Sequence, residues 1–180
     1  VSRKDGSASA EKNQEIRSEI KEYINRWCPN KEHPHIIHIG EAMEEESLPI
    51  LYNMADCFFC PSRGEGFFLP AAEAGSCEKP VITTNFGGHL DFLNKDNSFL
   101  IDIDGCDMSN QQIKTLSSYY ENVPFPVLGE KSVEQTKEYL KYVVENYSDA
   151  KEKAKKLREN IVENFTWDKK KKKIYKRLKE

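Results

Sequence analysis

Short apolar segments alternate with helical segments along the middle of this chain, and this alternation limits its fold more than any other feature. Four runs rich in β-branched or aromatic residues have the length of strands: residues 35–40, 56–61, 79–84 and 98–103. The runs are continuously apolar, as in parallel strands that are buried on both faces. Two of the intervening segments, residues 47–55 and 69–77, carry proline in a first helical turn. This order predicts βαβ units and a parallel sheet.

Further helices are predicted on both sides of this region. Residues 11–27 have apolar positions at helical spacing, and residues 105–131 read as a long connection with one possible helix in 111–120. Ser132 and Gln135 fit a capping box that opens a helix to about residue 147. Two more helices follow, one from about residue 149 and one through the C-terminal tail. The predicted class is α/β, a Rossmann-like parallel sheet with helices on both faces, closed by the C-terminal helices of 132–180.

Length and composition describe one domain of a globular protein. The 180 residues are 38% hydrophobic and 32% charged, and a net charge of −3 gives no reason to expect a nucleic-acid partner. No apolar run approaches the roughly 20 residues of a membrane span, so no integral membrane segment is expected. Five cysteines, an odd number, favour a reducing compartment over a disulfide scaffold. We therefore predict a cytoplasmic location.

Cys57 and Cys60 have the CxxC spacing of zinc and redox sites. In a strand, however, residues three positions apart point to opposite faces of the sheet and cannot share a metal ion. The sequence shows no second CxxC or histidine pair at ligand spacing. We expect no metal site.

The lysine run Lys169–Lys173 lies in the tail, with Trp167, Ile174 and Leu178 as the apolar stripe of the predicted helix. Five consecutive helical residues point nearly all the way round the axis. The favoured interpretation is a solvated surface whose long side chains also cover apolar groups. The alternative is contact with an anionic lipid or a nucleic acid.

A loop with two glycines follows the second predicted strand and leads into a helix that begins near Leu69. Ligands of doubly wound sheets bind at such places, beyond the carboxyl ends of the strands. The helix N-terminus has unpaired N–H groups that suit a phosphate, and Gly64 and Gly66 allow the backbone to approach it. Glu65 in the loop can accept bonds from sugar hydroxyls, and Glu73, one turn into the helix, from a ribose. Alternatively, Glu73 is an ordinary exposed helical residue.

The segment ADCFFCPSRGEGFFLPAAEAGSCEKPVITTNFGG, residues 55–88, resembles the nucleotide-sugar-binding segment of retaining GT-B glycosyltransferases of group 1, the family 4 type. The matching positions are Pro61, Ser62, Glu65, Gly66, Phe67, Leu69, Pro70, Glu73, Ala74, Pro80, Val81, Ile82, Gly87 and Gly88. Weaker resemblance extends the similarity to about residues 33–104 and 133–180. It implies that the chain, residues 1–180, is one donor-binding domain, the C-terminal half of a GT-B fold.

The resemblance also implies roles for individual residues. Glu65 is expected to contact the donor sugar and to be the catalytic residue, and Glu73 to bind the ribose. The backbone amides of the residues after Glu65 are expected to approach the sugar phosphate. The donor-binding candidates are Ser62, Gly64, Glu65, Gly66, Phe67, Phe68, Leu69, Glu73, Gly87 and Gly88, with His89 as a weaker one. Phe68 departs from the family, which usually has glycine there, so its side chain is expected to narrow the donor pocket or shift the loop.

The partners implied are a nucleotide sugar and an N-terminal GT-B acceptor domain, for which this sequence has no counterpart. No cofactor or metal is expected. Arg3 and Lys12 could be the pair that binds the pyrophosphate, although the favoured interpretation places Val1 at the end of the family's second strand, with that pair absent from the sequence. Two alternatives remain: a non-catalytic GT-B-like binding module, and a GT-B nucleotide-sugar epimerase.

Overall fold

The computed structural model of the 180-residue chain describes residues 10–30, 32–107 and 123–178. The chain divides into two compact units, Val1–Leu48 and Pro49–Glu180. We describe each unit by itself.

The first unit contains the helix α1 (Ala10–Trp27), an extended segment and a short 3-10 turn, η1 (Glu45–Ser47). The Asn13 side chain donates a hydrogen bond to the carbonyl oxygen of Gly40 over 3.1 Å and so joins α1 to the extended segment. The prediction of a buried strand over 35–40 is wrong for this structure. These residues form no strand, and Ile37 is 73% exposed. Apolar β-branched residues favour an extended backbone, but a strand also requires a hydrogen-bonded neighbour.

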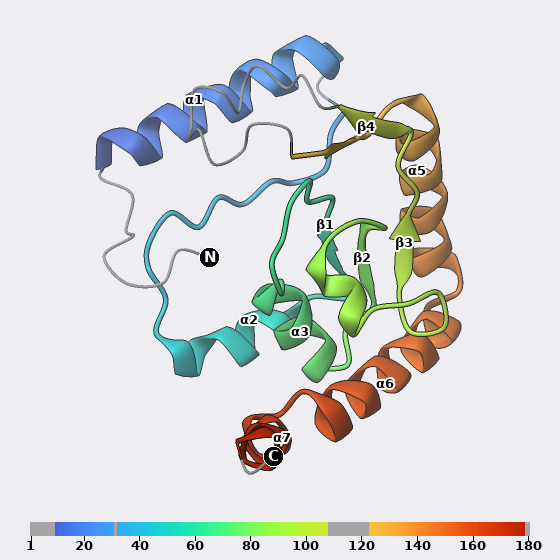
Figure 1. The fold of residues 1–180 in the computed structure, drawn as a ribbon. Helices are drawn as coiled ribbons and strands as arrows, with labels where there is room; N and C mark the ends of the chain where they lie inside the picture. Colours follow the sequence, from blue (N-terminus) through green and yellow to red (C-terminus); the bar gives the residue numbers. More distant parts are fainter. Residues whose placement is uncertain (1–9, 31, 108–122, 179–180) are drawn as a thin grey trace. The chain divides into compact units, whose positions relative to one another are not determined.

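The second unit is built on a three-stranded sheet (Figure 1). The helix α2 (Leu48–Met54) crosses the boundary between the units and leads to β1 (Phe58–Cys60), α3 (Leu69–Ser76), β2 (Val81–Thr84), η2 (Gly88–Asp91) and β3 (Phe99–Ile101). All pairings are parallel in the order β1-β2-β3, with Ile82 aligned to Phe59 on one side and to Phe99 on the other. The predicted parallel sheet is confirmed.

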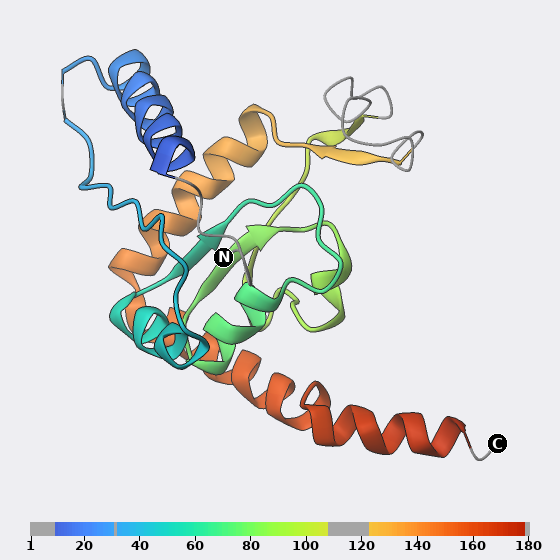
Figure 2. The ribbon, with the colours of Figure 1, turned by 90° about the vertical axis from the view of Figure 1, so that its left-hand side faces the viewer.

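Helices flank this sheet on both faces. The long helix α5 (Glu130–Glu145) packs Val143 against Ile82, Phe99 and Ile101. Figure 2 shows α5 on one side of the sheet and α3 on the other. Every residue of β2 is buried, as expected for a central parallel strand.

The side chains of α5 also close the outer edge of β3. Tyr139 donates its hydroxyl to the carbonyl oxygen of Leu100 over 3.4 Å. Just beyond the strand, the amide of Asp102 donates to Gln135 Oε1 over 2.7 Å. Backbone groups that another strand could otherwise use are therefore bonded to a helix.

The helix α6 (Tyr147–Asn164) lies against α3 and buries Ala150, Ala154, Leu157 and Ile161. The sequence predicts Ala154, Leu157, Ile161 and Phe165 on one face of this helix; the first three are buried, and Phe165 follows the helix and is half-buried. Gly75 of α3 makes this approach possible. A Cβ atom at Gly75 would lie 2.6 Å from Cδ2 of Leu157 and 3.0 Å from Cδ1 of Ile161.

The predicted terminal helix is confirmed as α7 (Trp167–Arg177). Its apolar stripe does not pack into the protein as we expected. Trp167 is 90% exposed, Ile174 57% and Leu178 77%.

The predicted connection over 105–131 contains two short strands that we did not predict. The strands β4 (Gly105–Asp107) and β5 (Phe125–Val127) pair antiparallel. Three-residue strands carry too little periodicity to be recognised. The helix predicted within 111–120 lies outside the described residues.

The capping box predicted at Ser132 is wrong, because α5 begins two residues earlier, at Glu130. Its first turn is capped from outside by Asp104. The Oδ2 atom of Asp104 accepts bonds from the amides of Gly129, over 2.9 Å, and Ser132, over 3.0 Å, and also from the Ser132 hydroxyl. The carboxylate of Asp104, 28 residues before Ser132, thus provides the cap that we expected from Ser132.

Candidate functional site

Two loops meet beyond the carboxyl ends of β1 and β2. The amide of Gly88 donates a hydrogen bond to the carbonyl oxygen of Glu65 over 3.0 Å. A Cβ atom at Gly88 would overlap the carbonyl oxygen of Gly66, and Gly87 has a φ of 120°, where side chains are strained. The predicted Gly-Gly loop is therefore in direct contact with the predicted glutamate loop, and only glycine at position 88 permits that contact.

The Glu65 carboxylate is fixed by its own loop. Ser62 donates its hydroxyl to Glu65 Oε1 over 2.8 Å, and the Glu65 side chain is half-buried. The sequence placed Ser62 among the candidate residues, and the structure gives it a role in orienting Glu65.

The N-terminus of α3 has no side-chain cap. The amides of Ala71 and Ala72 bond to the carbonyl oxygen of Phe68 over 3.1 and 3.3 Å, and proline occupies the next position before them. Within the described ranges, no acceptor is found for the amides of residues 66–69. These donors, at the positive end of the helix, can bind an anion.

Phe68 is the N-cap of α3 and has φ 68° and ψ 62°, the left-handed conformation that favours glycine. Its ring is 6% exposed and packs between Phe58 and His89, with ring centroids at 5.8 and 5.5 Å. We expected a side chain here to narrow the donor pocket or to shift the loop. The ring instead lies in the protein interior.

Phe67 faces a different part of the unit. Its ring lies 5.0 Å from that of Phe92 and 6.0 Å from that of Phe165, which directly follows α6. The two phenylalanines of the motif thus anchor the loop in two directions. The next candidate residue, Leu69, is 48% exposed at the start of α3.

Glu73 lies one turn into α3 and is half-buried. The hydroxyl of Tyr52, a buried residue of α2, donates to Glu73 Oε2 over 3.0 Å. Sequence reasoning missed Tyr52, because nothing in the spacing of residues 48–55 indicates that this helix lies beside α3. Glu73 is therefore not a freely solvated helical residue, because its carboxylate is bonded to a buried tyrosine.

His89 is completely buried behind the Gly-Gly loop. Its Nε2 lies 2.7 Å from the carbonyl oxygen of Thr84. A carbonyl oxygen can only accept, so Nε2 carries a proton, and in the neutral ring Nδ1 is then an acceptor. In the described part of the chain Nδ1 has no hydrogen-bond partner, and a Cβ at Gly87 would lie 3.3 Å from it.

The β4–β5 pair also touches the glutamate loop, which the sequence did not indicate. Arg63 Nε donates to the carbonyl oxygen of Pro126 over 3.0 Å. Arg3 and Lys12 are the alternative candidates for a pyrophosphate pair, and Arg3 lies outside the described residues. Lys12 lies on α1, in the first unit, and pairs with Glu15 over 2.8 Å.

The CxxC pair shows no sign of reactive chemistry. Burial raises the pKa of the Cys57 thiol to about 12 and also raises the pKa of Cys60. A protonated thiol is a poor nucleophile and metal ligand. Among the residues that the structure describes, no group of three or more His, Cys, Asp or Glu side chains is placed to hold a metal ion.

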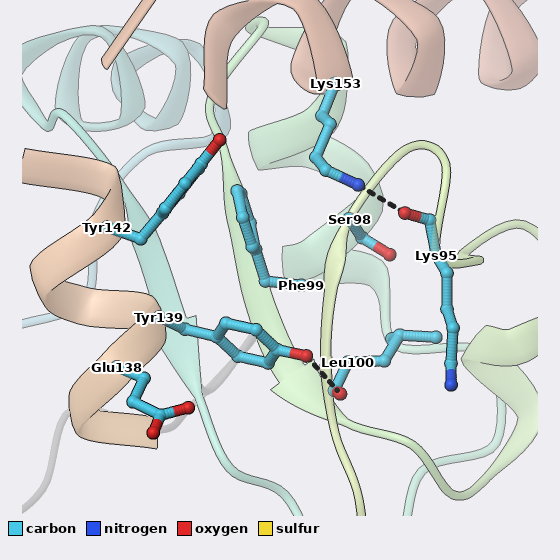
Figure 3. A pocket seen from close by; sticks show the side chains of 8 residues that line it. All are labelled: Lys95, Ser98, Phe99, Leu100, Glu138, Tyr139, Tyr142 and Lys153. Atoms are coloured by element: carbon cyan, nitrogen blue, oxygen red, sulfur yellow. Dashed lines mark hydrogen bonds between the residues drawn. The ribbon is translucent and has the colours of Figure 1, made fainter. Parts of the chain in front are cut away.

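A separate cavity of about 360 Å³ lies beside the amino end of β3 (Figure 3), and no residue of the two loops lines it. Phe99, Tyr139, Tyr142 and Lys153 form much of its wall. Lys153 donates to the carbonyl oxygen of Lys95 and lies 5.3 Å from the centre of the Phe99 ring, and burial lowers its pKa. Ser98, Tyr139, Tyr142 and Lys153 use their polar groups in hydrogen bonds within the protein, and we assign no ligand to this cavity.

No helix in the described ranges is long and apolar enough to cross a membrane. A search of curated protein sequences finds no significant match to this chain.

Solved structures with a similar fold were found among glycosyltransferases. The C-terminal domain of the glycosyl transferase group 1 family protein LpcC from Francisella tularensis matches 85% of this chain, with 20% identity and a TM-score of 0.55. HepE from Anabaena, solved with UDP and glucose, matches 93% with 17% identity and a TM-score of 0.65. Sucrose-phosphate synthase from Thermosynechococcus elongatus matches 91% with 18% identity and a TM-score of 0.62.

This chain spans 64% of the LpcC domain, 37% of HepE and 34% of the synthase. It therefore has the fold of the C-terminal half of a GT-B glycosyltransferase. The sequence pattern described as Glycosyl transferases group 1 matches residues 17–122, more than half of the chain and including both glutamates and the Gly-Gly loop. The chain belongs to the glycosyl transferases group 1 family.

Proposed function

We propose that this chain is the donor-binding part of a retaining glycosyltransferase, which transfers a hexose from a nucleoside diphosphate sugar to an acceptor hydroxyl. The observation that carries the proposal is the contact between the Glu65–Gly66 backbone and Gly88, beside the uncapped N-terminus of α3. Two carboxylates, free amide donors and a helix N-terminus then lie within one short stretch of chain. This combination suits a ligand with both hydroxyls and phosphates.

Each group has a distinct task in the proposed reaction. Glu73, held by Tyr52, accepts the ribose hydroxyls, and Glu65, held by Ser62, accepts hydroxyls of the sugar. The amides of residues 66–69 bind the diphosphate, whose negative charge grows as its bond to the anomeric carbon breaks. The acceptor hydroxyl oxygen forms the new bond to that carbon, its proton passes to the departing diphosphate, and the anomeric configuration is the same as before.

The phosphate charge is met here by amides and a helix dipole, so we propose that donor binding needs neither metal nor cofactor. The acceptor is proposed to bind a separate N-terminal domain. A further domain agrees with the length of two structural relatives. HepE and the synthase are each nearly three times as long as the part that this chain matches.

A second candidate is a non-catalytic module that binds a nucleotide or glycan. Phe68 favours it, because the left-handed position at the start of α3 carries a bulky residue where glycine would be unstrained. The intact pair of held glutamates favours the enzyme.

The test is calorimetric titration of the chain with UDP, GDP and ADP and with their glucose or mannose conjugates. Glu73→Gln keeps an acceptor oxygen for Tyr52 but removes the charge that strengthens bonds to the ribose. We expect a loss of about tenfold or more in affinity for the nucleotide, because charge-assisted bonds are worth roughly 1.5–3 kcal/mol and each decade needs about 1.4 kcal/mol.

Glu65→Gln is expected to weaken the sugar conjugate more than the bare nucleotide. Glu159→Gln is the matched control, since Glu159 is an exposed carboxylate on α6, and it should leave both affinities unchanged. If the wild type binds a nucleotide and the two site variants bind it equally well, the donor-site proposal fails. Equal loss of both ligands in Glu65→Gln would favour the nucleotide-binding module.

A further inference from the structure

Tyr52 joins α2 to the glutamate of α3 that lies beside the uncapped helix N-terminus. Its side chain is 8% exposed, and its hydroxyl donates to Glu73 Oε2 over 3.0 Å. The two residues are 21 positions apart along the chain, so the fold and not a local turn brings them together. A carboxylate of the candidate site is therefore bonded to a buried group from another helix.

The Tyr52 ring is fixed by a row of aromatic contacts. Its centre lies 6.3 Å from that of Phe58 in β1, and Phe58 lies 5.8 Å from Phe68 at the N-cap of α3. Phe68 in turn lies 5.5 Å from the ring of His89, behind the Gly-Gly loop. The row thus connects the partner of Glu73 to both loops, and a hydroxyl on a ring packed in this way points in one direction.

A fixed hydroxyl also fixes the carboxylate that it bonds. A glutamate side chain without such a bond samples several rotamers. The two oxygens of a carboxylate share one carbon, so a bond that holds Oε2 of Glu73 determines where Oε1 lies. A tyrosine hydroxyl is a neutral donor and leaves the negative charge of Glu73 in place, and that charge strengthens bonds from ligand hydroxyls.

We propose that Tyr52 is a positioning residue that directs the Glu73 carboxylate toward the ribose, and that the site thereby selects nucleotides that carry both ribose hydroxyls. The inference rests on the proposed role of Glu73 and adds a residue that does not touch the ligand. A side chain that is already held in place loses less rotamer freedom when the ligand binds. A nucleotide without the two hydroxyls offers this carboxylate no donor, so it gains nothing from the arrangement.

The experiment is calorimetric titration of the full chain with UDP, GDP and ADP, each compared with its 2′,3′-dideoxy counterpart. The wild type should bind the ribonucleotide at least about tenfold more tightly than the dideoxynucleotide, because only the ribonucleotide makes charge-assisted bonds to Glu73. Tyr52→Phe keeps the ring and removes the hydroxyl. It should weaken the ribonucleotide about three- to tenfold, the effect of releasing one long side chain, and leave the dideoxynucleotide unchanged.

Three further variants isolate the cause. Tyr139→Phe is the matched control, because it also removes a hydroxyl bonded within the protein, to the carbonyl oxygen of Leu100, and it should change neither affinity. In a Glu73→Ala background, Tyr52→Phe should cause no further loss of ribonucleotide affinity. Glu73→Asp keeps the charge on a shorter side chain, which cannot place its oxygens as Glu73 does, and it should lose the same discrimination. Urea unfolding establishes that each variant is folded.

The possible outcomes separate this inference from the proposed function. If Glu73→Ala weakens the ribonucleotide but Tyr52→Phe does not, the donor site stands and the positioning role of Tyr52 is wrong. If Tyr52→Phe weakens both forms of the nucleotide equally, Tyr52 only supports the fold, and the inference is overturned. If the wild type binds the two forms equally, or binds no nucleotide, the proposed role of Glu73 fails and the inference fails with it.

Discussion

Phe68 holds a strained backbone conformation because its ring is buried. The left-handed region costs a residue other than glycine roughly 1–2 kcal/mol. Removing a buried phenylalanine ring costs about 3–5 kcal/mol, and the Phe68 ring is packed between Phe58 and His89. The packing outweighs the strain, so phenylalanine is tolerated at the helix N-cap.

This balance predicts an unusual order of stability among variants at position 68. Phe68→Ala should destabilise the protein by about 3–5 kcal/mol. Phe68→Gly loses the same ring but also loses the strain, so it should be the more stable of the two by about 1 kcal/mol. Urea unfolding of both variants measures the difference.

Phe59 supplies the control, because it is a partly exposed residue of β1 without a positive φ. There glycine should be less stable than alanine, as is normal in a strand. Finding alanine the better replacement at both positions would contradict the assigned conformation of Phe68.

The sequence could locate the two glutamates, because the loop and the helix that carry them follow directly from local patterns. It could not provide the partners of Glu73 and Gly88, since Tyr52 and the Glu65 carbonyl oxygen reach them only through the packing of α2 and of the two loops. Contacts between residues distant in sequence depend on the fold, and a local pattern does not contain them.

At the scale of elements, Asp104 ties the end of the β3–β4 segment to the start of α5. The pKa of its carboxyl is lowered, first by the Ser132 hydroxyl and then by backbone amides. A carboxyl whose pKa is lower in the folded than in the unfolded protein stabilises the fold at pH values above its unfolded pKa. This stabilisation is lost as the pH falls through the folded pKa. The contribution of Asp104 should therefore be present at neutral pH and disappear in acid.

Asp104→Asn tests this dependence through urea unfolding at a series of pH values. The variant should be less stable than the wild type above about pH 5, and the difference should narrow as the pH falls below the ordinary aspartate pKa of 3.8. Asp91→Asn, at an exposed carboxylate of η2, is the control and should show no such narrowing. If the difference in stability between Asp104→Asn and the wild type stays constant down to pH 2, the charge of Asp104 does not contribute to stability.

Most elements were predictable because their periodicity or apolar content is local. The strands β1, β2 and β3 and the helices α1, α3, α6 and α7 lie close to their expected positions. The errors have a common cause. Residues 35–40 have the composition of a strand without a paired neighbour, and the true cap of α5 comes from Asp104, outside the helix.

At the scale of the whole second unit, Gly75 joins the half that carries the candidate site to the C-terminal helices. Alanine normally stabilises a helix by about 1 kcal/mol relative to glycine. Here its Cβ would collide with the fully buried Leu157. We expect Gly75→Ala to destabilise the protein by about 1–3 kcal/mol, as overpacked cores do.

A double-mutant cycle checks the cause. Leu157→Ala alone should cost about 2–5 kcal/mol, but it also makes room for the new methyl group. The double variant should therefore be more stable than the sum of the two single effects predicts. Strict additivity in urea unfolding would mean that Gly75 and Leu157 do not limit the approach of α3 and α6.

The bonds from Gln135 and Tyr139 to the β3 edge have a consequence for how this protein associates. The sheet runs β1-β2-β3, and its β3 end is closed by helix side chains. Any strand that the sheet accepts, from this polypeptide or another, must add at β1. A sheet with one open edge can pair once and then has no further edge, so pairing between copies through this three-stranded sheet would stop at a dimer.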